Sequence, residues 1–320
     1  MSEKIVVLDA KPLDAGDLDW DALRALGDAT LFDDTDSGEV NARIADAQFI
    51  FTNKVKLSAD AFEAAPKLQM VGVLATGFDI IDIEAARENN VTVCNVPSYS
   101  SNFTAQTTWA LLLELAHHVG LHSQGVRDGE WQKADAFSFW KTPLVELDGK
   151  TLAVVGLGKI GSQVARVAQA MGMKVIAAQL PGREKGSEDG IEYLALEDAF
   201  RRADVISLHC PFTDETREII NQETLGWMKP TALLINTSRG LLVDEAVLSR
   251  ALENQQIAGY AADVLSSEPP SNDNPLLSAP RCIITPHFAW ASLESRQRLQ
   301  SVSIENLRAF QNGEPQNVVS

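Results

Sequence analysis

The feature that most constrains the fold is a glycine pattern between two apolar runs. Residues 151–178 read TLAVVGLGKIGSQVARVAQAMGMKVIAA, with glycines at Gly156, Gly158 and Gly161. The pattern follows a predicted strand and opens a stretch with apolar residues at helical spacing, after which a second strand begins. The first glycine permits the tight turn, the second lets backbone approach a pyrophosphate, and the third lets helix and strand pack closely. Because a helix N-terminus favours an anion, the segment predicts a dinucleotide-binding unit.

The same alternation of short apolar runs and helical stretches occupies two blocks of the chain. In the first block we predict strands at 5–9, 30–32, 48–52, 69–75 and 91–96, with helices at 19–26, 58–65 and 82–89. In the second we predict strands at 151–156, 173–178, 204–209, 231–236, 257–263 and 281–285, with helices at 161–171, 196–203 and 244–255. A final helix is predicted at 293–311. The pattern indicates an α/β protein with two Rossmann-like, doubly wound parallel sheets.

The region between the blocks differs from both. Apolar residues at helical spacing predict one long helix over 101–122, and residues 125–143 are predicted to be irregular. That irregular stretch holds Trp131, Phe137, Phe139 and Trp140. So many large aromatics in a loop indicate packing against another subunit or across a cleft, and we expect a homodimer.

Composition excludes several classes of function. The 320 residues suffice for about two domains, and 27 Lys and Arg against 44 Asp and Glu give a formal charge of −17. An acidic chain is a poor match for nucleic acid or an anionic membrane. Cys94, Cys210 and Cys282 are far apart, so we expect no disulfide framework and no metal site. The chain shows no secretory leader and no apolar run long enough to span a bilayer, so a cytoplasmic location is expected.

The end of the second strand in the glycine unit departs from the usual pattern. NAD sites generally place an acidic side chain there for the ribose hydroxyls, whereas this chain has Gln179, followed by Arg183. A neutral amide does not repel a 2′-phosphate, so the hypothesis is that NADP(H) is accepted, with a weak preference over NAD(H). The alternative is that Gln179 bonds the ribose diol and NAD(H) is used.

Polar side chains follow three predicted strands of the second block. Arg239 follows one strand, Asp263 ends the next and precedes Glu268, and His287 follows the last. Ligands of open α/β sheets bind beyond the carboxyl ends of strands, so we expect these groups to converge near a bound nicotinamide.

At this point the sequence resembles the D-isomer-specific 2-hydroxyacid dehydrogenases, in their glycerate dehydrogenase and hydroxypyruvate reductase branch. The resemblance spans essentially the whole chain. It is carried by GLGKIG, HCPFTDETR at 209–217, LLINTSRG, DVLSSEPP and TPHFAW, in the order typical of the family. It implies a flavodoxin-like substrate domain of residues 1–100 and 290–320, and an NAD(P)-binding domain of residues 101–289.

The resemblance also implies a mechanism that the chemistry supports. Arg239 is expected to bind the carboxylate and carbonyl oxygen of a 2-keto acid, because its planar fork suits a bidentate anion. His287 is expected to exchange a proton with the carbonyl oxygen, which suits an imidazole near neutral pH. Glu268 is expected to orient His287 and favour its protonated form. The reaction implied is reversible NAD(P)-dependent reduction of a small 2-keto acid, hydroxypyruvate or glyoxylate, to the D-2-hydroxy acid.

The resemblance assigns further positions to each ligand. The backbone amides of Thr76 and Gly77 are expected to bind the substrate carboxylate, with Asn53 and Lys54 in a substrate-side loop. Trp140 is expected to enter the partner's active site. Cofactor contacts are expected from Gly156, Gly158, Lys159, Ile160, Gly161, Gln179, Arg183, Cys210, Pro211, Thr237, Ser238, Asp263, His287 and Ala289.

The sequence leaves two other functions open. A short-form phosphoglycerate dehydrogenase would carry the same motifs. A cofactor-sensing binding module of the C-terminal-binding-protein kind would also retain the catalytic residues.

Overall fold

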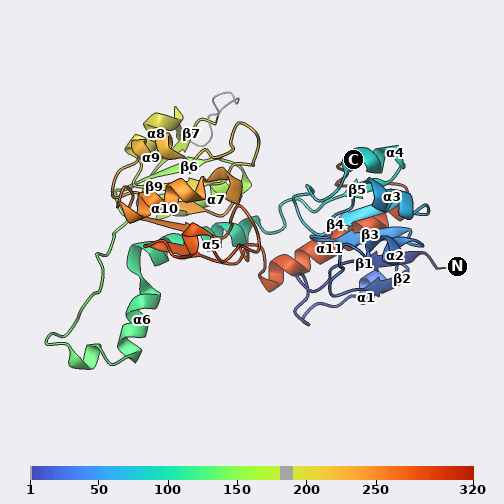
Figure 1. Ribbon diagram of the computed structural model, residues 1–320, viewed down its shortest axis with the longest axis horizontal. Coiled ribbons are helices and arrows are strands. Elements are labelled where there is room, and N and C mark those ends of the chain that lie inside the picture. The colour runs from blue at the N-terminus through green and yellow to red at the C-terminus, as the bar shows by residue number, and fades with distance from the viewer. Residues whose placement is uncertain (1, 181–189) are drawn as a thin grey trace. The chain divides into compact units, whose positions relative to one another are not determined.

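The computed structural model describes residues 2–180 and 190–320, which form two compact units. Unit 1 comprises residues 1–100 and 290–320, and unit 2 comprises residues 101–289. Figure 1 shows both units, with the chain coloured from blue at the N-terminus to red at the C-terminus.

Unit 1 is built on one parallel sheet of five strands in the order β2-β1-β3-β4-β5. The strands are β1 (Lys4–Val7), β2 (Asp28–Leu31), β3 (Phe49–Thr52), β4 (Met70–Val73) and β5 (Thr92–Cys94). The connecting helices are α1 (Asp21–Arg24), α2 (Val40–Ile44), α3 (Ala59–Ala64) and α4 (Ile83–Glu88). This order is that of flavodoxin-like sheets, in which the direction of winding reverses between β1 and β3.

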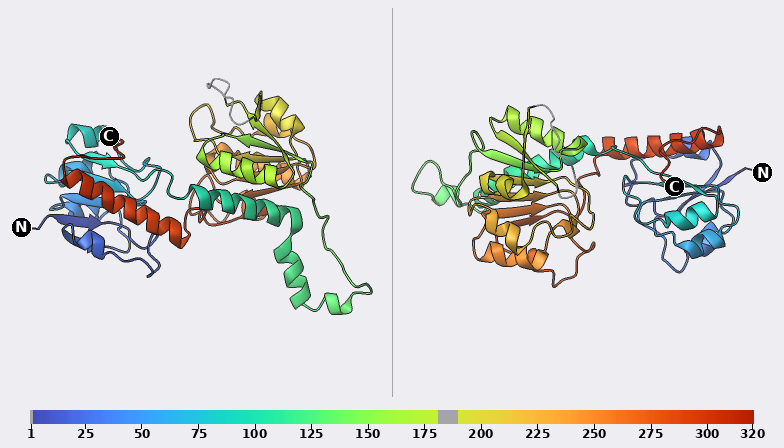
Figure 2. Two further views of the ribbon diagram at one scale, coloured as in Figure 1. Left: turned by 180° about the vertical axis from the view of Figure 1, so that it is seen from behind. Right: turned by 90° about the horizontal axis from the view of Figure 1, so that it is seen from above.

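Period-2 alternation along the strands of unit 1 supplies two separate cores. Val6 and Ile50 belong to the core beneath α2, α3 and α4, while Ile5 and Phe49 belong to the core on the opposite face. Helix α11 (Leu293–Gln311) completes that second core, and its predicted bounds are confirmed. Figure 2 shows it lying along this sheet. The last residues of the chain pair with the free edge of the sheet through an antiparallel bridge between Cys94 and Val318.

Unit 2 contains a parallel sheet of seven strands in the order β12-β11-β10-β9-β6-β7-β8. The strands are β6 (Thr151–Val155), β7 (Lys174–Ala178), β8 (Glu192–Leu194), β9 (Val205–Leu208), β10 (Leu233–Asn236), β11 (Gly259–Ala262) and β12 (Cys282–Ile284). Central strands β9, β10 and β11 are buried along their whole length, as expected of a parallel sheet covered on both faces. The predicted fold class, two doubly wound parallel sheets, is confirmed.

Helices cover both faces of this second sheet. They are α5 (Ser101–His117), α7 (Lys159–Ala170), α8 (Leu196–Arg202), α9 (Gln222–Trp227) and α10 (Glu245–Glu253), with short 3₁₀ turns η2 (Gly240–Leu242) and η3 (Pro275–Leu277). The sequence patterns did not predict α2, β8 or α9, because each is too short, at three to six residues, to show a period of its own.

The prediction of one helix over 101–122 is wrong. Helix α5 ends at His117, His118 adopts a left-handed backbone with φ 49°, and α6 (Val119–Arg127) begins in a new direction. The irregular stretch therefore starts after Arg127, and a 3₁₀ turn, η1 (Trp131–Lys133), interrupts it. Figure 1 shows α6 and η1 standing away from the sheet of unit 2 as an arm.

Candidate active site

The glycine loop forms the turn that a dinucleotide requires. It links β6 to α7, and Gly156 has φ +100°, a conformation that disfavours every residue with a Cβ. A Cβ on Gly161 would lie 2.2 Å from the Gly156 carbonyl oxygen, so the close packing of helix on turn depends on this glycine. A Cβ on Gly158 would meet nothing within 4 Å, and Gly158 caps α7. The open space at a helix N-terminus fits a pyrophosphate, so the residues present fit NAD(P).

Three other predicted cofactor residues follow neighbouring strands of the same sheet. Gln179 comes directly after β7, and its amide N–H donates to the Leu194 carbonyl at 2.8 Å. Cys210 and Pro211 follow β9, where the Cys210 amide nitrogen faces Gly156. These positions flank β6, where the winding of the sheet reverses, and this is where dinucleotides bind in such folds. Arg183, the second basis of the NADP(H) hypothesis, lies outside the described residues.

The turn after β10 places Arg239 at the carboxyl edge of the sheet. Asn236 shapes this turn, because its side chain accepts from the Ser238 amide at 3.0 Å and donates to the Arg239 carbonyl at 2.8 Å. Thr237 is held by a 2.8 Å hydroxyl contact with Thr108 of α5. The Arg239 side chain is exposed, and within residues 2–180 and 190–320 it forms no ion pair. It is therefore available to an anionic ligand.

Glycine at position 240 brings the Arg239 turn against the turn that carries Glu268. A Cβ on Gly240 would lie 1.9 Å from the Leu265 carbonyl carbon, so no other residue fits without moving one of the two turns. In the second turn, Glu268 Oε1 accepts from the Leu265 amide at 3.0 Å. The two turns thus form one packed surface at the carboxyl edge of β10 and β11.

The structure joins Glu268 and His287 directly. His287 Nδ1 lies 2.5 Å from Glu268 Oε2, and each side chain keeps about a third of its surface exposed (33% and 34%). With the Nδ1–H donated to a carboxylate, the tautomer of the imidazole is fixed and Nε2 is left for a ligand. A carboxylate–imidazole pair of this kind is suited to moving one proton.

Asp263 holds the turn that carries His287 through hydrogen bonds. Its carboxylate accepts from the Thr285 hydroxyl at 2.6 Å, the Phe288 amide at 3.0 Å and the Ala289 amide at 2.7 Å. Burial raises the pKa of Asp263, and these hydrogen bonds and the nearby His287 oppose that shift. Both carboxylate oxygens are thus already engaged by the 285–289 turn, and whether Asp263 also contacts the nicotinamide stays a prediction.

Unit 1 contains the remaining substrate-side positions. Thr76 and Gly77 follow β4, and the Thr76 hydroxyl donates to the Val96 carbonyl at 2.8 Å. In the described part of the chain, the amide N–H groups of Thr76 and Gly77 have no acceptor, which leaves them for an anion. The Asn53 side chain is only 4% exposed and donates to the Leu74 carbonyl at 2.5 Å, whereas Lys54 is exposed.

Trp140 lies on the arm of unit 2. It is 68% exposed, and Phe137 and Trp131 beside it are 91% and 51% exposed. The arm is braced by Trp131 Nε1, which donates to the Phe137 carbonyl at 2.9 Å, and by the Lys141 amide, which donates to His122 Nε2 at 3.0 Å. The aromatic side chains therefore stand on an ordered segment without a covering surface in this unit.

Sequence reasoning missed Asn236, Gly240 and Asp9, the last a buried carboxylate in unit 1. Asn236 and Gly240 act through backbone packing, which leaves no pattern along the chain. Asp9 ends a predicted strand, which is the same positional feature that singled out Asp263. Among the described residues, no cluster of His, Cys, Asp and Glu is suited to hold a metal ion. In that part of the chain, none of the helices combines the length and hydropathy needed to cross a membrane.

The fold and the site together define a Rossmann-type, nicotinamide-dependent oxidoreductase. The sequence model for the D-isomer specific 2-hydroxyacid dehydrogenase NAD-binding domain matches residues 109–289. The chain belongs to the D-isomer specific 2-hydroxyacid dehydrogenase family.

Named relatives cover the full length of the chain. Hydroxypyruvate reductase of Blautia hydrogenotrophica is 43% identical over 99% of both proteins. Glycerate dehydrogenase of Methylorubrum extorquens is 37% identical over 100% of this chain and 99% of that protein. Among solved structures, the NADPH-dependent glyoxylate/hydroxypyruvate reductase of Sinorhizobium meliloti, in complex with NADP and malonate, superposes with a TM-score of 0.84. It is 29% identical over 99% of this chain and 97% of that one.

Proposed function

We propose that this protein catalyses the reversible NAD(P)-dependent reduction of a small 2-keto acid, hydroxypyruvate or glyoxylate, to the D-2-hydroxy acid. The observation that carries the proposal is the Glu268–His287 pair, held at 2.5 Å at the carboxyl edge of a dinucleotide-binding sheet. The named relatives act on substrates of this class. The bound cofactor supplies the hydride that reaches the substrate C2.

In this reaction His287 is the acid–base residue. During reduction, His287 Nε2 donates a proton to the substrate carbonyl oxygen as C2 receives the hydride, and the product is a hydroxyl group. During oxidation the same nitrogen takes the hydroxyl proton. Glu268 acts as the positioning residue, because its hydrogen bond to Nδ1 sets the ring orientation and its charge stabilises the imidazolium.

Arg239 binds the substrate carboxylate and polarises its carbonyl oxygen. The Arg239 guanidinium is exposed and has no ion pair in the described chain. Its planar set of N–H donors can therefore hydrogen-bond to the carboxylate and to the carbonyl oxygen together. In unit 1, the amides of Thr76 and Gly77, which have no acceptor among residues 2–180 and 190–320, bind the carboxylate. Lys54 contacts the substrate from its own turn. Asn53 shapes that turn through its bond to Leu74 and is 4% exposed.

We propose that NADP(H) is the preferred cofactor. The support is Gln179, a neutral side chain at the end of β7, where an acidic residue would repel a 2′-phosphate. The glycine loop from Gly156 to Gly161 binds the pyrophosphate. The contacts expected of Lys159, Ile160, Thr237, Ser238 and Ala289 stay predictions.

We also propose that the protein is a homodimer and that the arm forms part of the dimer interface. A cytoplasmic location is a separate proposal. The exposed Phe137 and Trp140 on a braced segment support packing against a second copy, with Trp140 entering the partner's site. Sedimentation should give a dimer, and Trp140→Ala should raise KM for the keto acid. A monomer at assay concentration would contradict both statements.

The decisive test follows oxidation of the reduced cofactor by its absorbance. The purified protein is given hydroxypyruvate, glyoxylate, pyruvate or 3-phosphohydroxypyruvate, each with NADH and with NADPH. Turnover is expected to be fastest with hydroxypyruvate or glyoxylate, and with a lower KM for NADPH than for NADH. Preference for the phosphorylated substrate would instead identify a phosphoglycerate dehydrogenase. No turnover with any of them, while cofactor still binds, would contradict the proposed reaction.

A further inference from the structure

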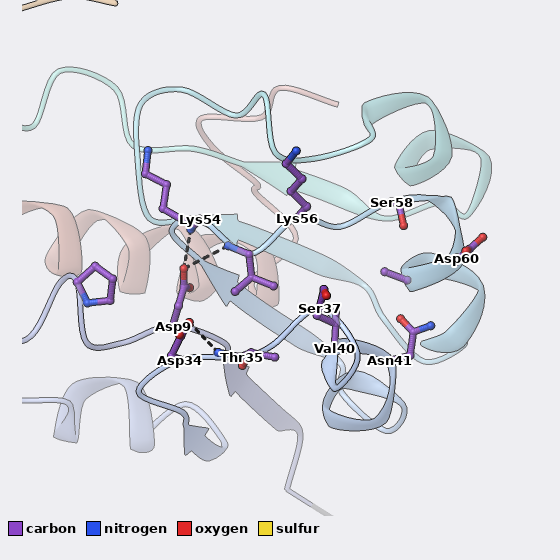
Figure 3. A pocket seen from close by; sticks show the side chains of 13 residues that line it. Asp9, Asp34, Thr35, Ser37, Val40, Asn41, Lys54, Lys56, Ser58 and Asp60 are labelled. Atoms are coloured by element: carbon purple, nitrogen blue, oxygen red, sulfur yellow. Dashed lines mark hydrogen bonds between the residues drawn. The ribbon is translucent and has the colours of Figure 1, made fainter. Parts of the chain in front are cut away.

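A buried carboxylate stands where the sheet of unit 1 reverses its winding. Asp9 is two residues beyond the end of β1, and the turn after β3 lies next to it. Open α/β sheets bind ligands at the carboxyl edge, at the point where strand order reverses. A hollow of about 580 Å³ opens at this edge, and Asp9, Lys54 and Val55 contribute to its lining (Figure 3).

Asp9 is enclosed by the backbone of the turn that follows β3. Its Oδ1 accepts from the Asn53 amide at 2.7 Å, and its Oδ2 accepts from the Lys54 amide at 2.6 Å and the Val55 amide at 3.3 Å. Only 2% of Asp9 is exposed. A buried carboxylate is costly unless it is hydrogen-bonded, so the three N–H groups turned toward it fix the backbone of the turn. Burial raises the pKa of Asp9, and these hydrogen bonds oppose that shift.

The geometry requires a carboxylate and not only a polar side chain. Two acceptor oxygens serve three N–H donors, and a carboxylate is the one side chain of this size that offers two oxygens and no hydrogen. An asparagine would direct an N–H toward one of the backbone N–H groups. The turn would then have to leave its position or lose hydrogen bonds.

The turn held by Asp9 directs Lys54 away from the carboxylate. Figure 3 shows the Lys54 side chain leaving the turn on the opposite side from Asp9. The same turn is tied to the end of β4 by the Asn53 side chain, which donates to the Leu74 carbonyl. Two anchors, Asp9 just beyond β1 and Leu74 just beyond β4, therefore fix the backbone of the turn from which Lys54 projects.

We propose that Asp9 is the positioning residue of the substrate-binding turn, and that through Lys54 it sets the affinity for the 2-keto acid. The proposal rests on the proposed function. Proton transfer depends on His287, which belongs to unit 2, so Asp9 affects substrate binding and not the chemical step. An interaction made equally in ground state and transition state changes KM and leaves kcat.

Asp14 supplies a matched control in the same unit. Its carboxylate also holds a turn, accepting from the amides of Gly16 at 2.8 Å, Asp17 at 3.0 Å and Leu18 at 3.1 Å. Asp9→Asn is expected to raise KM for the best keto acid at least about tenfold, with kcat within about threefold and KM for the reduced cofactor unchanged. All three of these amides bind Oδ1, so Asp14→Asn makes the same chemical change while keeping their acceptor, loses only the bond from Trp20 Nε1 to Oδ2, and is expected to leave all three values unchanged.

A double-mutant cycle with Lys54→Met tests the route through Lys54. Lys54 is exposed, so this variant should fold even if the Asp9 variant does not, and it should raise KM by itself. Adding Asp9→Asn to Lys54→Met should increase KM by less than about threefold, because the side chain that Asp9 positions is already absent. Backbone amide exchange over 53–55 should accelerate in Asp9→Asn and not in Asp14→Asn.

The outcomes separate this proposal from the proposed function. A wild-type protein inactive on every keto acid contradicts the proposed function itself. With an active wild type, an unchanged KM in Lys54→Met or Asp9→Asn overturns the role of Asp9. A loss confined to kcat, or full additivity of the two substitutions, overturns it as well.

Discussion

Asp263 and His287 are connected through backbone and not through their side chains. The Asp263 carboxylate accepts from the amides of Phe288 and Ala289, the two residues that follow His287. His287 itself has φ 51°, a conformation that residues with a Cβ rarely adopt, and its amide donates to the Thr285 carbonyl at 3.0 Å. The carboxylate thus stabilises the turn that presents the imidazole, as Asp9 stabilises the turn that presents Lys54.

This relationship predicts the effect of Asp263→Asn. The amide offers one acceptor oxygen where the turn needs two, so the His287 turn should shift. We expect kcat to fall at least about tenfold, and the unfolding free energy to fall by about 2 kcal/mol from the lost charged hydrogen bonds. Cofactor affinity, measured by fluorescence titration, should stay within about threefold of wild type. A large loss of cofactor affinity with kcat retained would show that Asp263 acts on the nicotinamide instead.

The Glu268–His287 pair predicts a graded loss of turnover. His287→Asn removes the proton donor and should lower kcat about a hundredfold or more, since general acid–base catalysis contributes about 10²–10⁴-fold. Glu268→Gln keeps a hydrogen-bond acceptor but removes the charge, and should lower kcat by about tenfold to a hundredfold. KM for the cofactor should stay at the wild-type value in both variants. Near-normal kcat in His287→Asn would require another proton donor.

Arg239→Lys tests whether the planar fork matters. Lysine keeps the charge but loses the bidentate geometry, so kcat/KM for the keto acid should fall about 10–100-fold. Among the described residues, the Arg239 side chain donates only to the neighbouring Ser238 carbonyl, so thermal stability should be nearly unchanged. Equal kcat/KM in the two proteins would exclude a bidentate contact with substrate.

Two glycines of the nucleotide loop should respond differently to alanine. Gly158 has φ −87° and open space around its Cβ position, so Gly158→Ala should keep its melting temperature within about 2 °C. It should nevertheless weaken cofactor binding at least about tenfold, because the methyl occupies the space for the pyrophosphate. Gly161→Ala places a Cβ 2.2 Å from the Gly156 carbonyl oxygen and should lose stability as well as affinity. Unchanged cofactor affinity in Gly158→Ala would place the phosphate elsewhere.

His209 predicts part of the acid sensitivity of the fold. Burial lowers its pKa from 6.5 to about 4, and its Nε2 lies 2.8 Å from the Ser207 hydroxyl. Between pH 6.5 and about 4 the unfolded chain binds a proton that the folded protein does not, so stability falls as pH falls through this window. Protonation of His209 lowers the free energy of unfolding by at most about 3 kcal/mol across this window. We expect about 2 kcal/mol, because His209 keeps some exposure to solvent.

Thermal unfolding at about pH 7.5 and about pH 5 checks this sign. His209→Gln should lose less stability than wild type between the two pH values. His117→Gln, a substitution of an exposed histidine on α5, should behave like wild type. An equal loss in all three proteins would assign the acid sensitivity to other groups.

The sequence alone determined the fold class and indicated the candidate site residues. Fully buried parallel strands need nearly continuous apolar runs, so β6, β9 and β10 are visible in the sequence within a residue or two of their bounds. The glycine pattern is equally local, because the turn, the phosphate approach and the helix packing each depend on one position. Arg239 and His287 were singled out because each lies just beyond a predicted strand, and Glu268 because it lies in the loop that follows the strand ending at Asp263.

The tertiary structure decided what depends on residues distant in the chain. The break of the long helix at His118 rests on one left-handed backbone conformation that falls on a histidine and not on a glycine. The bond between Glu268 and His287 spans 19 positions, and the bond between Asp9 and Lys54 spans 45. Periodicity records only which face a residue occupies, whereas these bonds depend on which turns the sheet places side by side. For that reason the sequence indicates candidate site residues, and the fold determines which carboxylates hold their turns in place.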